Sequence, residues 1–265
     1  MLRKWLYIFR REAAKKKRKF MNKLFGATGS ISRSTESLFL EKLPFRVEKC
    51  IDIGMNHGDY SKMVLGIFPG AEIVGIEPIE EFASECRELL PESVVVLNLA
   101  LSNGNEDISL YRKGQDANSD PRKPDPHSKQ VFQQVTVRTT TIDKLWSSEN
   151  FGDPDFIKID TDGYDLRALM GGRELVRRTR PVIQIEVSRY WRQTGSKTSD
   201  LDTFCADLGY SMHIMRPSGP QTISSARGLR NGQVTYNLIL VPEESSEIFL
   251  SAYEKGRNHL KFGKR

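Results

Sequence analysis

The chain has 265 residues, of which 38% are hydrophobic and 28% charged, and this composition is typical of a soluble domain with an extension. Residues 1–20 hold nine Lys or Arg and one Glu, whereas the remainder of the chain carries a net charge of −2. The net charge of +6 therefore belongs to one end of the chain. A nearly neutral domain lacks the basic surface that nucleic-acid binding needs, so we exclude a nucleic-acid partner.

The basic segment also has helical periodicity. Its apolar residues recur at helical spacing ahead of the basic run 15–19, and they are Leu2, Trp5, Leu6, Phe9 and Ala13. This apolar stretch is too short and too interrupted by charge for a signal peptide or a membrane span. Two interpretations stay open: an interfacial helix that contacts anionic lipid, and a solvated or partner-bound extension. Unchanged sedimentation with anionic vesicles after deletion of residues 1–25 would exclude the first.

The three cysteines, Cys50, Cys86 and Cys205, are odd in number and lack the spacing of metal ligands. We interpret them as reduced thiols, which favours a cytoplasmic location, at the inner membrane surface if the basic segment contacts lipid. Residues 26–37 are rich in Ser, Gly and Thr and predict a flexible link. We therefore divide the chain into an N-terminal extension, 1–37, and one domain, 38–265.

Strand and helix patterns alternate after this link. Apolar strands are predicted over 49–54, 72–77 and 94–101, with helices over 60–67 and 80–90 between them. Alternating segments at 107–112 and 135–142 predict an added antiparallel hairpin. The earlier rhythm resumes with strands over 156–160, 181–187, 210–216 and 236–241 and helices over 165–178 and 201–208. This order predicts an α/β fold with a doubly wound, mostly parallel sheet of the Rossmann-like type.

A long polar segment, 114–129, interrupts the predicted hairpin. It contains Pro121, Pro124 and Pro126. A loop of this length inside a domain is either functional or disordered, so a lid on the substrate side and simple disorder both stay open.

The first predicted strand ends in Asp52-Ile-Gly54-Met-Asn56-His-Gly58 and leads into a helix. Glycines at this point allow a tight turn and a close approach of a ligand to the backbone. The loop lacks the G-x-G-x-x-G of dinucleotide binders and the Lys-Ser/Thr of a P-loop. Its carboxylate would repel a pyrophosphate but suits the cationic aminoacyl end of S-adenosylmethionine (SAM). We predict that Asp52, Gly54, Asn56 and Gly58 bind SAM; a purely structural turn is the alternative.

Two further residues follow the next strands. Glu77 ends the second strand, 25 residues after Asp52, where an acidic side chain can bind both ribose hydroxyls of an adenosine ligand. An exposed strand-end carboxylate is the alternative for Glu77. Asn98 lies near the end of the third predicted strand, where the adenine edge is expected, although ordinary packing would also explain it.

Several ordered blocks follow one another between Cys50 and Val187: IDIGMNHGDYS, VGIEPIEEF, LNLALSNGNEDISLY, VRTTTIDKL, FIKIDTDGYDLRALMGG and RPVIQIEV. Together they resemble the FkbM-type methyltransferases. The resemblance implies a class I methyltransferase fold, SAM as the cofactor, and O-methylation of a hydroxyl on a sugar, glycan or natural product. Met55 stands where the family commonly has Ala, and Asp162 and Asp165 stand where it commonly has Glu. The shorter reach of these two side chains speaks against a direct catalytic role for either.

A hydroxyl is a poor nucleophile, and a positioned base or a metal would help to remove its proton. Asp160 ends the 156–160 strand and Glu186 lies near the end of the next strand. Because open α/β sheets bind ligands at the carboxyl ends of their strands, both residues are predicted to be catalytic. Lys158 is the less favoured candidate, since strand alternation would point it elsewhere. A helix N-cap is the alternative for Asp160.

Two other classes of function stay open. Asp160-Thr-Asp162 resembles the D-x-D site of metal-dependent nucleotide-sugar glycosyltransferases, although its spacing does not match a calcium-binding loop. A catalytically inactive SAM-fold protein that serves as a binding module is the third possibility. We assign no metal ligands and expect a small-molecule or glycan acceptor as the partner.

The remaining polar and aromatic candidates can be explained by structural roles alone. Arg189, Tyr190 and Trp191 follow the 181–187 strand and could clamp a sugar acceptor, or could form a partly buried aromatic cluster. We interpret the histidines as non-catalytic, including His57 in the glycine loop and His213 in a late strand.

Overall fold

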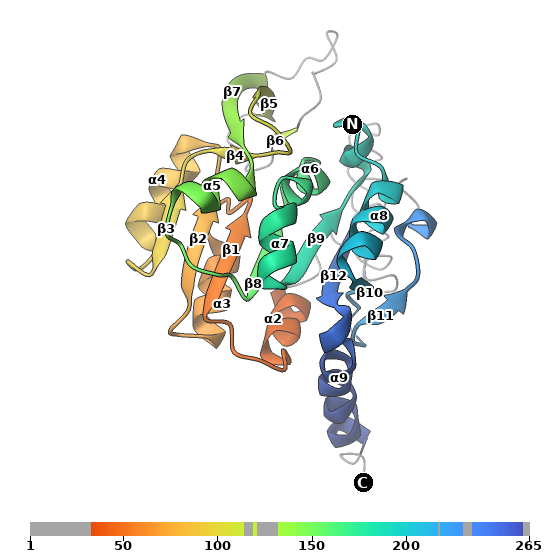
Figure 1. Cartoon of the computed structure of the whole chain (residues 1–265). Helices are drawn as coiled ribbons and strands as arrows, with labels where there is room; N and C mark the ends of the chain where they lie inside the picture. Colours follow the sequence, from red (N-terminus) through yellow and green to blue (C-terminus); the bar gives the residue numbers. More distant parts are fainter. Residues whose placement is uncertain (1–32, 114–118, 121–131, 217, 230–234, 262–265) are drawn as a thin grey trace, which may run out of the picture.

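The computed structural model of the chain describes residues 33–113, 119–120, 132–216, 218–229 and 235–261. Its centre is an eight-stranded sheet with the order β11-β10-β12-β9-β8-β1-β2-β3 (Figure 1). Five neighbouring strands are parallel: β3 (Val94–Leu97), β2 (Glu72–Ile76), β1 (Lys49–Ile53), β8 (Phe156–Ile159) and β9 (Val182–Val187). Beyond β9 the sheet continues with antiparallel strands, which are β12 (Tyr236–Pro242), β10 (Tyr210–Ile214) and β11 (Gln221–Ile223). The predicted doubly wound, mostly parallel sheet is confirmed.

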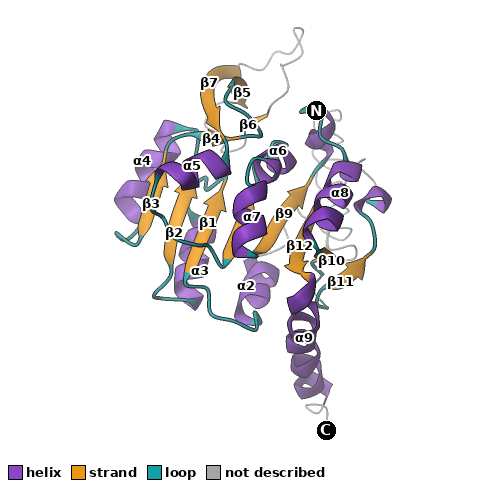
Figure 2. Ribbon diagram, viewed as in Figure 1, coloured by secondary structure: helices purple, strands orange, loops and turns teal. Residues whose placement is uncertain are grey.

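Helices cover both faces of this sheet, so that the domain has three layers (Figure 2). One face carries α2 (Arg33–Glu41), α3 (Asp59–Ile67), α4 (Glu80–Leu89) and α9 (Ser246–Lys261). The other face carries α5 (Ile142–Ser148), α6 (Asp165–Met170), α7 (Arg173–Thr179) and α8 (Thr198–Leu208). Because the central strands are buried from both sides, their sequences are nearly continuous apolar runs, which is what made them recognisable.

A second, smaller sheet stands at the carboxyl edge of β1 and β2 (Figure 1). It consists of β4 (Ala100–Leu101), β5 (Asp107–Lys113), β6 (Ser119–Asp120) and β7 (Phe132–Thr140), and its β5–β7 pair is the predicted antiparallel hairpin. In the main sheet the direction of strand succession reverses between β1 and β8. The loops after these two strands therefore diverge, and such a point is where open α/β sheets bind ligands.

Two predicted strands have different bounds in the structure. The strand expected over 94–101 is split into β3 and β4, because the chain leaves the main sheet at Asn98 and β4 pairs with β7. The strand expected over 135–142 ends at Thr140, since the hydroxyl of Thr141 accepts a hydrogen bond from the backbone N–H of Lys144 at 3.1 Å and caps α5. Helix α5 was therefore missed.

The single helix expected over 165–178 is two helices, α6 and α7, with Gly171 and Gly172 between them. A Cβ atom at Gly171 would lie 2.2 Å from the carbonyl oxygen of Ser102, so the backbone break packs directly against the end of β4. The apolar residues keep their helical spacing across these two glycines, so the sequence pattern does not reveal that the helix is interrupted.

Helices α2 and α9 were not expected. Phe39 of α2 is buried and its ring packs near Phe156 of β8 and Tyr253 of α9, at centroid distances of 6.1 and 6.2 Å. Residues 33–37 therefore fold with the domain, and α2 spans the predicted boundary at residue 37. The basic segment 1–20 and, apart from β6, the candidate lid 114–129 lie outside the described residues.

All three cysteines are buried and none forms a disulfide. Across the parts of the chain that the structure describes, no helix combines the length and the apolar character that crossing a membrane requires.

Candidate active site

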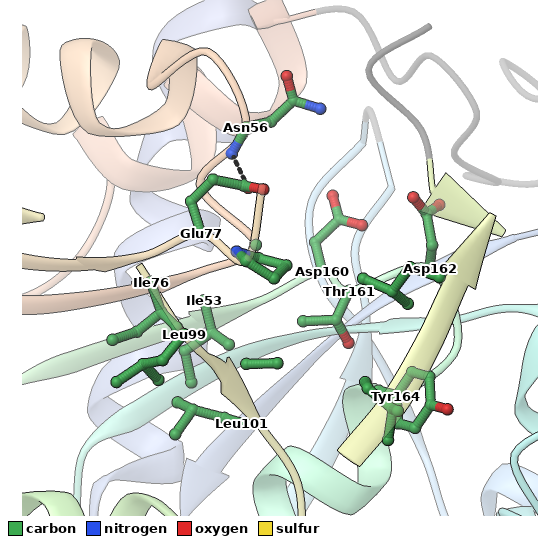
Figure 3. Close-up of a pocket in the computed structure, with 15 residues that line it drawn as sticks. Ile53, Asn56, Ile76, Glu77, Leu99, Leu101, Asp160, Thr161, Asp162 and Tyr164 are labelled. Carbon is green, nitrogen blue, oxygen red and sulfur yellow. Dashed lines mark hydrogen bonds between the residues drawn. The ribbon is translucent and has the colours of Figure 1, made fainter. Parts of the chain in front are cut away.

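A pocket opens at the carboxyl edge of the parallel strands, where the loops after β1, β2 and β8 meet the second sheet (Figure 3). Its volume is about 560 Å³, part of which is open to solvent. Polar loop residues such as Asn56, Glu77 and Asp160 form one side, and apolar residues such as Leu99 and Leu101 form the other. Neither Lys nor Arg is among the fifteen described residues that line it.

Gly54 turns the chain out of β1 and forms part of the pocket. It has a φ of +79°, and its backbone N–H donates a hydrogen bond to the carbonyl of Ile76 at 3.0 Å. A Cβ atom at this position would lie 1.8 Å from the carbonyl oxygen of Asp160. The loop after β1 thus rests directly on the loop after β8, which only glycine permits.

Replacing Gly54 by Ala is expected to lower the free energy of unfolding by about 3 kcal/mol, since it adds both a backbone strain and a steric overlap. Urea unfolding followed by circular dichroism measures this loss. Gly66→Ala in α3 is the matched control, because a Cβ atom there meets nothing within 4 Å. A Gly54→Ala protein as stable as this control would contradict the described contact between the two loops.

Glu77 is held against the glycine loop. Its carboxylate accepts hydrogen bonds from the backbone N–H groups of Asn56 and Ile79, both at 2.8 Å. Burial raises the pKa of Glu77, while these two bonds oppose the rise. Asn56, with a φ of 52°, and Glu77 both line the pocket, so the structure brings these two predicted cofactor residues together.

Asp52 and Lys158 occupy places that the sequence did not predict. Asp52 is fully buried and does not line the pocket; its Oδ2 accepts a hydrogen bond from Ser61 at 2.7 Å. Nζ of Lys158 lies 3.3 Å from Oδ1 of Asp52, donates to the carbonyl of Gly54 at 2.9 Å, and lies 3.8 Å from Oδ2 of Asp160. Lys158 lies in β8 and Asp160 directly follows this strand, two residues later. Asp52 therefore contacts the pocket residue Asp160 only indirectly, through Lys158, and its predicted role in cofactor binding stays a prediction.

Lys158 keeps its positive charge in this setting. Burial of the ammonium group opposes the charge, but the carboxylates of Asp52 and Asp160 raise the pKa of Lys158 above its usual value. Lys158 does not line the pocket, but its side chain links the backbone of the β1 loop at Gly54 to Asp160.

Gly58 and Asn98 also lie outside the pocket lining. Gly58 has a φ of 71° at the start of α3 and packs against Cys86 and Leu90, so its role is to begin the helix. The side-chain amide of Asn98 donates to the carbonyl of Glu77 at 3.0 Å and faces a neighbouring groove. Asn98 therefore fixes the end of β2 at the point where the chain leaves β3.

Asp160 lies in the pocket with its side chain 47% exposed. It precedes a turn in which buried Asp165 accepts hydrogen bonds from the backbone N–H groups of Thr161 and Gly163, at 2.6 and 3.0 Å. Helix α6 begins at Asp165, so Asp160 is not a helix N-cap and that alternative is wrong. Asp165 instead orders the turn that presents Asp160 and Asp162 to the pocket.

Glu186 of β9 is near this group but is not among the residues that line the pocket. Burial raises the pKa of Glu186 well above its usual value, and the charges of Asp160 and Asp165 add to this rise. This environment favours the protonated form of Glu186 and distinguishes it from the solvent-exposed Asp160.

The segment after β9 has a structural role at two of its three positions. Trp191 is buried, and its indole N–H donates to Asp165 at 3.0 Å, so it belongs to the core. Tyr190 packs over Gly163, where a Cβ atom would lie 2.7 Å from the Cβ of Tyr190. Arg189 is exposed and contacts the ring of Tyr190. These contacts support the buried-cluster interpretation for Trp191.

Sequence reasoning missed most of the apolar side of the pocket. Leu99, Leu101, Ile108 and Leu110 line it, and the last three come from the second sheet. Apolar alternation in 107–112 predicted a strand with one buried face but not which partner buries that face. Among the described residues, no three His, Cys, Asp or Glu side chains are grouped so that they could hold a metal ion.

A family model described as the methyltransferase FkbM domain matches residues 52–212. The chain belongs to the FkbM methyltransferase family. As a member of this family it is a SAM-dependent methyltransferase, and the resemblance found in the sequence is confirmed.

Similarity to individual proteins is lower in identity and extends over part of the chain. This FkbM chain is 26% identical to the 2-O-methyltransferase NoeI of Sinorhizobium fredii over 145 residues, which are 49% of this chain and 59% of that protein. It resembles the structure of the methyltransferase FkbM from Methylobacillus flagellatus KT (TM-score 0.47, 16% identity, 73% of this chain and 43% of that one). It also resembles the precorrin-6y C5,15-methyltransferase from Geobacter metallireducens GS-15 (TM-score 0.43, 13% identity, 81% and 92%).

Proposed function

We propose that this FkbM methyltransferase transfers the methyl group of SAM to a hydroxyl of a sugar or glycan. The observation that carries the proposal is the carboxylate of Asp160, which lines the pocket and stays open to solvent. The similarity to a 2-O-methyltransferase supports a hydroxyl as the acceptor.

The residues present fit SAM. Carboxylates of Glu77, Asp160 and Asp162 line the pocket, and none of its described lining residues is Lys or Arg. This acidic lining suits a sulfonium and an ammonium group better than a phosphate. We assign the ribose hydroxyls to Glu77 and the adenine to the apolar side formed by Leu99 and Ile108. Gly54 and Asn56 would approach the bound ligand through their backbone. When bound, SAM supplies an electrophilic methyl group for in-line displacement.

The two predicted catalytic carboxyls take different roles in this proposal. Asp160 accepts the proton of the acceptor hydroxyl, and its exposure lets the proton pass to solvent. The raised pKa of Glu186 favours its protonated form, which makes it a weaker candidate for removing a proton. Neighbouring carboxyls whose environments separate their protonation states in this way commonly divide the acid and base functions of a site.

The two alternative functions are a nucleotide-sugar glycosyltransferase and a catalytically inactive SAM-binding module. A nucleotide-sugar glycosyltransferase needs cations to hold a diphosphate, and the family match together with the acidic lining favours methyl transfer over it. A catalytically inactive SAM-binding module shares the pocket and differs only in turnover.

Calorimetry with SAM and S-adenosylhomocysteine, followed by incubation with a panel of sugars and oligosaccharides, tests the proposal. We expect both nucleosides to bind and an alkali-stable methyl ether to form on one acceptor class, detected by mass spectrometry. Binding of SAM without transfer to any hydroxyl would support the binding module instead. Methylation confined to an amine or a carboxyl group would contradict the proposed acceptor.

A further inference from the structure

A hydrogen-bonded network of polar side chains lies on the sheet face that carries α2 and α3. Oε1 of Glu36, in the first turn of α2, accepts hydrogen bonds from the amides of Gln184 and Asn237, both at 3.1 Å. The hydroxyl of Tyr60 in α3 donates to Oε1 of Gln184 at 2.9 Å. Gln184, Asn237 and Tyr60 are all buried, and such groups are stable in a core only when they are hydrogen-bonded.

The register of the main sheet places this hydrogen-bonded network next to the residues around Asp160. Asp52, Lys158 and Gln184 are direct neighbours across β1, β8 and β9, so that their side chains share one face. One step nearer the carboxyl edge, Glu186 is the partner of Asn237 across β9 and β12. Glu36 therefore packs on the sheet face that holds Asp52, Lys158 and Gln184. On this face Lys158 lies within ion-pair distance of Asp160. The ring of Tyr60 lies 5.5 Å from Nζ of Lys158 and covers the ammonium group from the α3 side.

We propose that Glu36 is a positioning residue of the methyl-transfer site, which acts on Asp160 through Lys158 and through its own charge. The inference rests on the proposed role of Asp160 as proton acceptor. Glu36 lies before the segment 52–212 that matches the family, so α2 adds a group to the site that the family match does not include.

The charge of Glu36 responds to the groups around it. Burial raises the pKa of Glu36 to about 7, the charge of Asp160 contributes to the rise, and Lys158 opposes it. Asp52 adds a smaller rise, and the remaining groups that contact Glu36, the amides of Gln184 and Asn237, are neutral. Glu36 is thus neutral below pH 7 and ionised above it. The ionised form adds negative charge beside Lys158 and Asp160, which makes it easier for this region to take up the acceptor's proton.

The first test needs no turnover. The infrared difference between wild type and Glu36→Gln isolates the carbonyl band of protonated Glu36, and its titration should have a midpoint near pH 7. In an Asp160→Asn background, compared with Asp160→Asn/Glu36→Gln, the midpoint should fall by about one pH unit because a neighbouring negative charge is lost. An unchanged midpoint would overturn the coupling between the two carboxyls.

The second test is the pH profile of Glu36→Gln, which mimics the neutral form at every pH. We expect kcat about tenfold below wild type at pH 8, a difference under about twofold at pH 6, and an unchanged KM for SAM. Glu41→Gln, at the exposed end of the same helix, is the matched control and should behave as wild type. An equal loss at both pH values would show a merely structural role and overturn the inference. If wild type methylates no hydroxyl, the proposed function fails and the infrared titration alone decides whether the coupling exists.

Discussion

Replacing Asp160 by Asn is expected to lower kcat for hydroxyl methylation about a hundredfold, which is the usual contribution of a positioned general base. The amide is nearly the same size as the carboxylate but accepts no proton at neutral pH. Because the side chain of Asp160 is 47% exposed and does not cap a helix, the substitution should leave the fold intact. Initial rates at saturating SAM and acceptor measure the effect.

Two controls separate this result from a loss of binding or of folding. The affinity for SAM should stay within about threefold of wild type, so that the loss lies in kcat. Asp153→Asn removes a surface carboxylate that pairs with Arg178 far from the pocket lining and should leave the rate unchanged. Full turnover by Asp160→Asn would rule out Asp160 as the base.

Replacing Glu77 by Ala is expected to weaken SAM binding about thirtyfold, which corresponds to about 2 kcal/mol for hydrogen bonds between a carboxylate and two hydroxyls. The variant also loses the bonds that Glu77 accepts from Asn56 and Ile79, so the glycine loop loses an anchor. Isothermal titration with SAM, well below the unfolding temperature, measures the affinity.

Two further variants separate the effect of the Glu77 charge from the effect of removing any nearby carboxylate. Glu77→Gln keeps an acceptor oxygen but loses the charge, and should fall between wild type and Glu77→Ala. Glu80→Gln alters an exposed carboxylate at the start of α4 that does not line the pocket, and should bind SAM as wild type does. Equal SAM affinity in Glu77→Ala and wild type would place the ribose elsewhere.

The parallel core and part of the site could be predicted because they depend on local patterns. Continuous apolar runs mark strands that are buried on both faces, and the glycines and acidic residues at their ends mark the edge where ligands bind. Gly54, Glu77 and Asp160 follow three such runs, and the structure places all three in one pocket.

The rest depends on contacts between distant residues. Whether Asp52 and Lys158 face a ligand or each other is set by the register of β1 against β8, which no local pattern specifies. The Ser- and Thr-rich start of α2 is typical of a linker, and it is helical because Phe39 and its neighbours pack on the sheet. The bonds from Glu36 to residues 184 and 237 cross 148 and 201 positions of sequence. Tertiary packing of this kind overrides local propensity.

A crystal structure of the chain with S-adenosylhomocysteine tests the central claim most directly. We predict that the nucleoside lies between the glycine loop and the turn after β8, with its ribose hydroxyls on Glu77 and its sulfur facing the side of Asp160. S-adenosylhomocysteine bound instead in the neighbouring groove lined by Arg138 and Lys144, with the pocket left to another ligand, would contradict it.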